Sequence, residues 1–208
     1  MIRELMVRVA RLERMAALVE GLQGRDLSGR DLSGANLMGA NLKGTNLKGT
    51  NLSKAILVQA SLEGADLEEA NLKGAIIIGA SLKGANLMGA DLEGADLTGA
   101  KLWNANLKGT NLSKVMLIQA VLEGASLEGA SLERAIIMGA SLKGASLMRA
   151  DLQRADITYS NLEGADLRGV NLSGADVRWA NLSGATYDES TTLPRSISPS
   201  QLASMSKV

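Results

Sequence analysis

The chain has no histidine, no cysteine and no phenylalanine among its 208 residues, and it has only two prolines. Without histidine it lacks the most common general base and metal ligand of proteins. Without cysteine it forms neither disulfides nor thiolates, so cysteine usage does not indicate a redox compartment. Aromatic residues make up only 2% of the chain, whereas globular cores draw much of their buried area from aromatic rings. An ordinary globular enzyme is therefore not expected.

An excess of charge of either sign is also missing, because 22 basic residues balance 22 acidic ones. A nucleic-acid-binding protein needs a basic surface, and a protein that imitates DNA needs a strongly negative field. No segment approaches the roughly 18 consecutive apolar residues of a membrane span, and the N-terminal segment is too highly charged for a signal peptide. We therefore expect a cytoplasmic protein that binds no nucleic acid and has no membrane span.

What the chain does have is a five-residue repeat. An aliphatic residue, here called the centre, occupies every fifth position from Leu27 to Leu182, which gives 32 uninterrupted repeats. Ala stands two residues before the centre in 24 of them, Asp, Asn or Ser directly before it in 26, and Gly two residues after it in 21. A period of five fits neither a continuous helix nor a flat strand. Each pentapeptide is therefore predicted to be a short extended piece followed by a turn.

The glycine position is predicted to lie in a turn. Glycine suits a residue with positive φ, as in the third position of a type II turn. Lys54, Gln59 and Asn104 are among the residues that replace glycine there. A different turn type is expected at those positions.

Exceptions to the repeat predict the size of one coil. Ile56, Ile76, Met116 and Ile136 replace the polar residue before the centre, at intervals of 20, 40 and 20 residues. A coil of four pentapeptides stacks all four on one side, whereas a coil of three scatters them. We therefore expect about eight four-sided coils and, at roughly 4.8 Å per coil, a rod about 40 Å long.

A longer repeat lies above the short one. Residues 46–96 align with residues 106–156, and 37 of the 51 positions are identical. The offset of sixty residues is three whole coils, so the pattern of outward side chains is expected to recur along the rod.

Repeats such as ANLMG, ADLEG, ADLTG and ANLKG resemble the A(D/N)LXX signature of the pentapeptide-repeat family. The resemblance covers residues 25–186, and the following TYDESTTLP is similar to the family's usual closing segment. It implies an all-β fold, a right-handed quadrilateral β-helix with Ala and Leu inside and the other three positions outside.

Three segments are expected along the chain. Residues 1–24 are predicted to form an N-terminal cap, with a helix over residues 2–20 whose apolar side covers the end of the rod. Residues 25–186 form the β-helix, with an irregular first coil because Arg25 and Arg30 stand where the repeat has Ala. Residues 187–208 form a C-terminal cap and tail, with a short helix that begins at Ser198 and Pro199.

One side of the predicted rod is apolar outside as well as inside, and we interpret it as a protein interface. An exposed apolar patch above roughly 400 Å² usually marks an interaction site. Three interpretations remain: contact with another protein, most simply a second copy in a homodimer; coverage by the chain's own ends; or an exposed patch tolerated because β-branched residues favour extended backbone. The predicted interface residues are Met38, Ile56, Val58, Ile76, Ile78, Met116, Ile118, Ile136, Met138, Tyr159 and Trp179.

The other sides carry mixed charges. On the next side Lys and Glu alternate along the rod, which predicts a mutually neutralising ladder of exposed ion pairs, each of little energetic value. The aspartates occupy a position where Asn and Ser also occur, which is typical of side chains that hydrogen-bond local backbone. No catalytic, cofactor-binding or metal-binding residues are therefore expected, and no cofactor. The ladder side carries Lys43, Glu63, Lys83, Trp103, Glu123, Lys143 and Glu163.

The leading functional hypothesis is a non-enzymatic rigid scaffold that binds a protein partner or a second copy through its apolar side. The resemblance also suggests an alternative, a DNA-mimicking inhibitor or protector of DNA gyrase of the quinolone-resistance type. Those family members are strongly acidic and have Phe at many centres, whereas this chain is neutral and has no Phe. The regularity of the repeats leaves a third interpretation, a designed or consensus scaffold without a natural partner.

Overall fold

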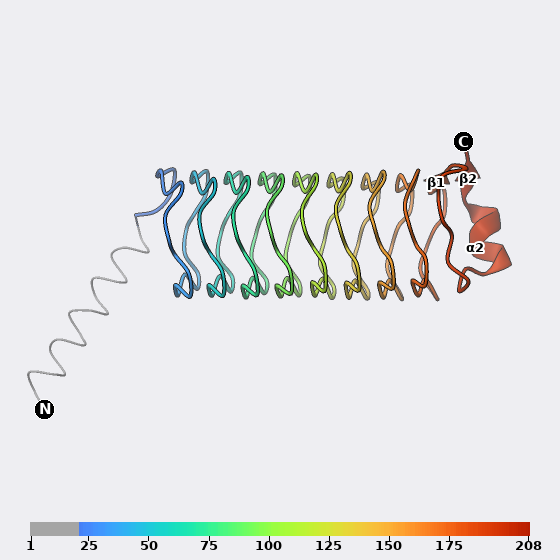
Figure 1. Cartoon of the computed structure of the whole chain (residues 1–208), viewed down its shortest axis with the longest axis horizontal. Helices are drawn as coiled ribbons and strands as arrows, with labels where there is room; N and C mark the ends of the chain where they lie inside the picture. Colours follow the sequence, from blue (N-terminus) through green and yellow to red (C-terminus); the bar gives the residue numbers. More distant parts are fainter. Residues whose placement is uncertain (1–20) are drawn as a thin grey trace, which may run out of the picture.

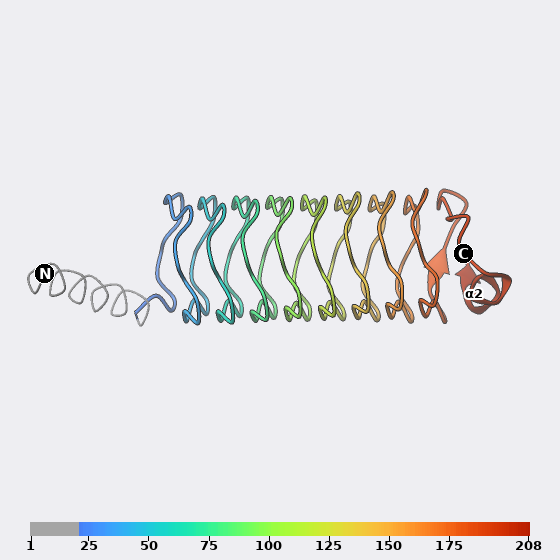
Figure 2. The same cartoon turned by 90° about the horizontal axis from the view of Figure 1, so that it is seen from below.

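Coils of 20 residues stack along one axis into a rod. The computed structural model describes residues 21–208, and Figures 1 and 2 show the stacked coils from two directions. Parallel bridges join the residue before each centre to the residue 20 positions later, from Asp26 with Asn46 to Asp166 with Thr186. Twenty residues are four pentapeptides, so the coil has four sides, as the spacing of the apolar exceptions predicts. The fold is a repeat β-solenoid.

Hydrogen bonds between coils run along the rod axis. The N–H of Leu57 donates to the carbonyl of Ile76 (2.7 Å), and the N–H of Ile76 donates to the carbonyl of Ala55 (2.9 Å). Each side of a coil contributes one such bridge and then turns, so most of the ladder consists of isolated bridges. The longer strands in residues 21–208 are β1 (Thr186–Tyr187) and β2 (Ser206–Lys207), which pair in parallel.

The same turn closes every pentapeptide of the solenoid. The glycines of the repeat have φ between 60° and 71°, and the eleven residues that replace glycine have φ between 54° and 60°. The expectation of a different turn at Lys54, Gln59 and Asn104 is therefore wrong. The residue at this position donates its N–H to the next coil, as Gln59 does to Ile78 (2.9 Å). Stacking thus imposes the left-handed conformation on residues with a Cβ, at a cost of about 1–2 kcal/mol each.

The interior is filled by the centres and by the small residues two positions before them. Leu97 and Ala95 are fully buried, and burying one leucine contributes roughly 1.5–3 kcal/mol. Where Thr or Ser occupies the position of the small residue, its hydroxyl donates a hydrogen bond to a carbonyl of the preceding coil. Thr110 Oγ1 donates in this way to the Leu87 carbonyl (2.9 Å). The core is therefore a continuous aliphatic column whose few polar groups are satisfied.

The first described coil is regular, which corrects the expectation of an irregular one. Asp26 and Asp31 form the same bridges as their equivalents further along the rod. Arg25 and Arg30 are exposed, and because the bridges use only main-chain groups, the long side chains do not disturb them. The helix predicted over residues 2–20 lies outside the described residues.

The C-terminal segment closes the other end of the rod, and its helix confirms the prediction. Helix α2 (Pro199–Ser204) is N-capped by Ser198, which forms a capping box with Gln201, and it lies against the last coil (Figure 1). Gln201 Nε2 donates to the carbonyls of Val177 (2.7 Å) and Ala180 (3.0 Å). A side chain thus replaces the N–H groups that a further coil would supply to this open edge.

Candidate protein-binding surface

The apolar exceptions lie in line on one side of the solenoid, which we call the apolar stripe. It comprises the outward residues around the centres Leu37, Leu57, Ile77, Leu97, Leu117, Ile137, Ile157 and Val177. Bridges stack Asn36 on Ile56, Ile56 on Ile76, and Met116 on Ile136. The structure therefore brings together the residues that the sequence selects, from Met38 in the first coil to Trp179 in the last.

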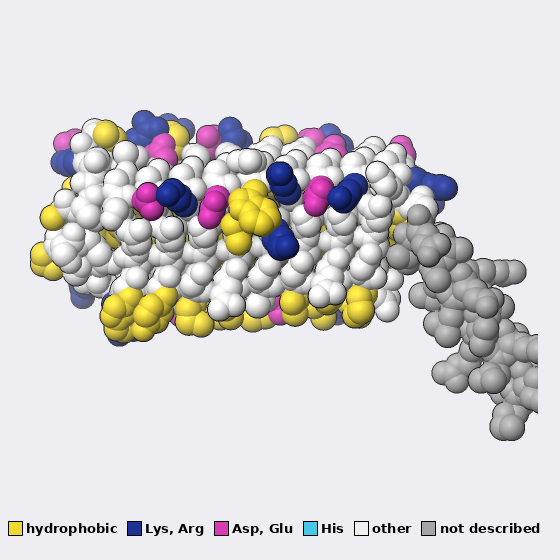
Figure 3. Space-filling view, turned by 180° about the vertical axis from the view of Figure 1, so that it is seen from behind, with side chains coloured by type: hydrophobic (Ala, Val, Ile, Leu, Met, Phe, Trp, Pro, Cys, Tyr) yellow, Lys and Arg dark blue, Asp and Glu magenta, His cyan; other side chains and the backbone are white. Residues whose placement is uncertain are grey.

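Much of the apolar stripe is accessible. Met38 is 56% exposed, Ile78 37% and Met138 38%, whereas Ile56, Val58, Met116 and Ile118 are half-buried. Hydrophobic side chains gather along the lower edge of the rod in Figure 3. Residues 187–208 lie at the end of the rod and leave these side chains exposed, so that part of the chain does not cover the stripe.

Two polar rows divide the apolar stripe at an interval of three coils. Asp96 Oδ1 accepts the N–H of Thr98 (2.9 Å), and Asp156 Oδ1 accepts both the N–H (3.0 Å) and the hydroxyl (2.7 Å) of Thr158. In each row the aspartate carboxylate is thus hydrogen-bonded to the threonine of the same row. The stripe is therefore two apolar doublets, one around Ile56 and Ile76 and the other around Met116 and Ile136, each followed by a polar row.

An aromatic pair stands at the end of the stripe. The rings of Tyr159 and Trp179 stack with centroids 4.9 Å apart and planes inclined by 9°, and the two residues are 60% and 62% exposed. Both occupy the turn position with φ of 60° and 59°, where glycine would be unstrained. The nine other residues that replace glycine share this conformation, so coil stacking accounts for it.

Sequence reasoning missed a charged pair beside these rings. Asp176 and Arg178 flank Val177, the last centre of the stripe, and form an ion pair of 2.5 Å. The Arg178 guanidinium lies 5.2 Å from the centroid of the Trp179 ring. The hydrogen bond from Arg178 holds the pKa of Asp176 below its ordinary value. The sequence could have indicated this pair, because Asp176 and Arg178 follow Asp156 and Thr158 of the stripe by 20 residues, which is one coil.

The neighbouring side carries the predicted charge ladder. Lys43 pairs with Glu63 one coil away (3.0 Å), and Lys143 pairs with Glu163 (3.0 Å). Figure 3 shows basic and acidic side chains alternating along the rod in a row that one hydrophobic group interrupts. The opposite charges of each pair neutralise one another. Because the pairs are exposed to solvent, each contributes little to stability.

The polar position before each centre has the predicted structural role. Asp66 Oδ1 accepts the N–H of Glu68 (3.1 Å), and it also accepts Asn86 Nδ2 from the next coil (3.0 Å). Asn106 Nδ2 continues the ladder to Asn86 Oδ1 (2.9 Å). These carboxylates and amides hold the turns and link the coils.

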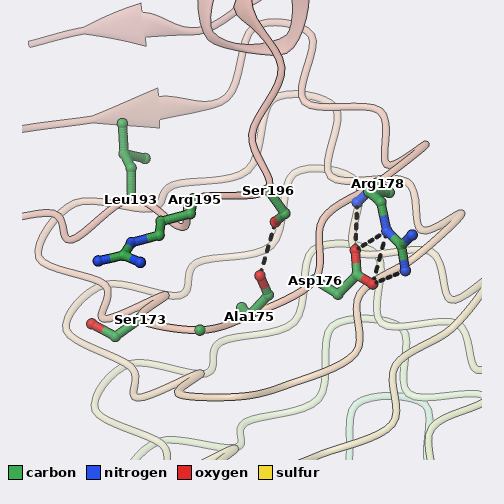
Figure 4. A pocket seen from close by; sticks show the side chains of 8 residues that line it. Ser173, Ala175, Asp176, Arg178, Leu193, Arg195 and Ser196 are labelled. Carbon is green, nitrogen blue, oxygen red and sulfur yellow. Dashed lines mark hydrogen bonds and ion pairs between the residues drawn. The ribbon is translucent and has the colours of Figure 1, made fainter.

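A depression of about 650 Å³ lies where the last coil meets the C-terminal segment. Figure 4 shows Ser173, Ala175, Asp176 and Arg178 on the coil side and Leu193, Arg195 and Ser196 on the other. Ser196 Oγ donates to the carbonyl of Ala175 (2.9 Å) and accepts the N–H of Val177 (3.2 Å). These hydrogen bonds of Ser196 therefore attach the C-terminal segment to the last coil.

Within residues 21–208, no group of three or more Asp, Glu, His or Cys side chains is placed to hold a metal ion. No helix in the same part of the chain has the length and hydropathy needed to cross a bilayer.

Comparisons with known proteins agree with this architecture. A family model described as pentapeptide repeats (8 copies) matches five overlapping segments, residues 22–59, 55–94, 90–125, 117–154 and 150–186. No curated protein matches the chain significantly.

Several solved structures are similar to the chain. One is HetL, a pentapeptide repeat protein involved in heterocyst differentiation regulation from the cyanobacterium Nostoc sp. strain PCC 7120, with 35% identity, 84% of this chain and 94% of that chain covered, and a TM-score of 0.40. Another is Rfr23 from the cyanobacterium Cyanothece 51142, with 32% identity, 49% and 63% covered, and a TM-score of 0.35. A trypsin-treated form of QnrB1, a plasmid-mediated fluoroquinolone resistance protein, has 21% identity, 91% and 85% covered, and a TM-score of 0.39. Because the family model matches far more than half of the chain, the chain belongs to the pentapeptide-repeat family.

Proposed function

We propose that this protein is a non-enzymatic rigid scaffold that binds a protein partner through the apolar stripe. The observation that carries the proposal is the alignment of exposed Ile76, Ile78, Ile136 and Met138 on one side of the rod. Exposed isoleucine and methionine side chains are unfavourably hydrated, and a partner surface that buries the two apolar doublets would be stabilised by removing them from water.

The remaining surface supports this assignment by contrast. Lysines and glutamates of the ladder side pair with each other, and the aspartates beside the centres hydrogen-bond backbone and amide groups. The acidic side chains are thus engaged within the rod and balanced by basic ones, which disfavours a DNA-mimicking role. The apolar stripe is the surface whose side chains lack equivalent partners in the described part of the chain.

Site-specific photo-cross-linking tests the proposal. A photoreactive amino acid replaces Ile78 in the full-length protein, produced at its natural level in the cells it comes from. Replacement of Met88 is the matched control, because Met88 is 40% exposed and lies on the opposite side of the rod. We expect a discrete cross-linked product from position 78 and none from position 88. No product from position 78, or the same products from both positions, would contradict the proposal.

A further inference from the structure

The outward residues of the apolar stripe form a pattern that is complementary to itself. Each coil presents one residue before its centre and one after it, and the two are of matching kind in the apolar rows, as Ile76 and Ile78 are. In the last coil they are opposite in charge, Asp176 and Arg178. Such a pattern constrains how two copies can meet.

A two-fold axis parallel to the rod places two copies face to face with their coils at equal heights. This isologous contact sets the residue before each centre opposite the residue after the same centre in the second copy. Ile76 then faces Ile78, Met116 faces Ile118, and Asp176 faces Arg178. The rows with two apolar residues therefore meet apolar rows, the charged row meets opposite charge, and in the first row Asn36 faces Met38.

An antiparallel contact fits the same residues less well. An antiparallel contact brings the doublets of the two copies together when its two-fold axis lies at the coil of Asp96. Asp96 of one copy then faces Asp96 of the other. Apposed like charges oppose association. That arrangement also leaves Asp176 and Arg178 of the last coil beyond the overlap, without a partner. The charges therefore favour the parallel contact.

The size of the stripe indicates how tightly the copies would associate. Three extended residues give a width of about 10 Å, and eight coils give a length of about 40 Å. Two such surfaces bury about 800 Å² in total, below the roughly 1,200–2,000 Å² of stable complexes. The exposed rings of Tyr159 and Trp179 add contact area at one edge. The expected complex is a dimer that dissociates on dilution.

We propose that the occupant of the apolar stripe is a second copy of this chain, bound in parallel about a two-fold axis along the rod, with Asp176 and Arg178 setting the orientation. This inference rests on the proposed function, because it identifies the partner of the same surface.

Sedimentation equilibrium of the full-length protein between about 1 μM and 1 mM tests the second copy, over a range that spans weak protein affinities. Asp176→Arg and Arg178→Asp each create like-charge pairs across the parallel contact, and each is expected to raise the dissociation constant at least about tenfold. The double variant D176R/R178D restores opposite charges and is expected to restore association.

The opposite side of the rod offers a matched control. Asp166 and Arg168 form the same local ion pair (2.6 Å) with the same spacing, so Asp166→Arg and Arg168→Asp are expected to leave association unchanged. A wild-type protein that is monomeric throughout the range would overturn the inference. The proposed function survives that result if position 78 still cross-links to a different protein. Equal effects of the swaps on both sides would overturn the role of Asp176 and Arg178.

A distance between spin labels tests the orientation. Because the chain has no cysteine, Met38→Cys provides a single labelling site in the first coil. In the parallel dimer the two labels lie in the same row and are expected less than about 20 Å apart, since packed β surfaces lie about 10 Å apart. The antiparallel contact separates them by six coils, about 29 Å. A distance near the longer value would contradict the parallel arrangement.

Discussion

The rings of Tyr159 and Trp179 stack almost parallel one coil apart, 4.9 Å between centroids, at two turn positions where the backbone has positive φ. The stack contributes about 0.5–1.5 kcal/mol beyond area burial, but holding each bulky residue in this conformation costs about 1–2 kcal/mol. For the two residues together the conformational cost, about 2–4 kcal/mol, exceeds the stacking contribution. The aromatic pair is thus better explained by contact with a partner than by stability of the rod.

Replacing both rings with glycine separates these roles. We expect Tyr159→Gly combined with Trp179→Gly not to lower the free energy of unfolding, because the relief of two strained turn positions outweighs the lost stack. Association through the apolar stripe should weaken at the same time. Chemical denaturation and sedimentation of the same sample measure both. A destabilisation above about 3 kcal/mol would show that the stack mainly supports the fold.

A second prediction concerns the glycine turns. Gly94 has φ of 66°, and an added Cβ would meet nothing within 4 Å. Gly94→Ala is therefore expected to cost only the conformational term, about 1 kcal/mol. At Gly124 the added Cβ would lie 2.5 Å from Asn104 Oδ1, so the end of that side chain must move aside and Gly124→Ala should cost slightly more. Denaturation midpoints rank the two, and a larger loss at Gly94 would contradict the account of the turn.

The small inward position gives a third prediction. Thr110 Oγ1 donates to the Leu87 carbonyl, which also accepts the N–H of Ala90 (3.0 Å). Because that carbonyl keeps a partner and Val115 occupies an equivalent position, Thr110→Val should change stability by less than about 1 kcal/mol. Leu97→Ala, which opens a cavity in the column, should cost about 2–5 kcal/mol. Similar losses for both variants in urea titrations would argue against an aliphatic core of this kind.

Asp188 makes the C-terminal end sensitive to acid. Hydrogen bonds, first from the Ser190 hydroxyl and then from Gly169 N–H and Thr191, lower the pKa of Asp188 to about 2 from an ordinary value of 3.8. Since the folded state favours the ionised carboxylate, its stabilising effect is complete above about pH 4 and is lost as the pH falls towards about 2. Thermal midpoints of the wild type should therefore fall over this range, and those of Asp188→Asn should fall less. Parallel curves for the two proteins would refute this role.

The sequence predicted the coil because its exceptions are periodic. Ile56, Ile76, Met116 and Ile136 could share one side only in a coil of 20 residues, and the bridges confirm this. The short helix after Ser198 was predictable because its capping residues are local in sequence. The right-handed sense of the coil and the N-terminal helix stay predictions.

The errors arose where tertiary contacts override local preference. Lys54, Gln59 and Asn104 suggest other turns when each is considered with its sequence neighbours alone. In the rod, the N–H of each must meet a carbonyl of the next coil, and this requirement selects one turn. The contacts of Gln201 with Val177 and Ala180, 21 and 24 residues away, likewise depend on the assembled end of the rod.

The most direct test of self-association through the apolar stripe is the solution mass of two matched double variants at high concentration. Ile78→Lys with Ile136→Lys places two charges on the stripe, 58 residues apart. Met88→Lys with Met148→Lys places the same charge on the opposite side, 60 residues apart. We predict that the wild type and the methionine variant sediment at twice the chain mass, and that the isoleucine variant sediments at the mass of one chain. Equal masses for all three proteins would contradict the account.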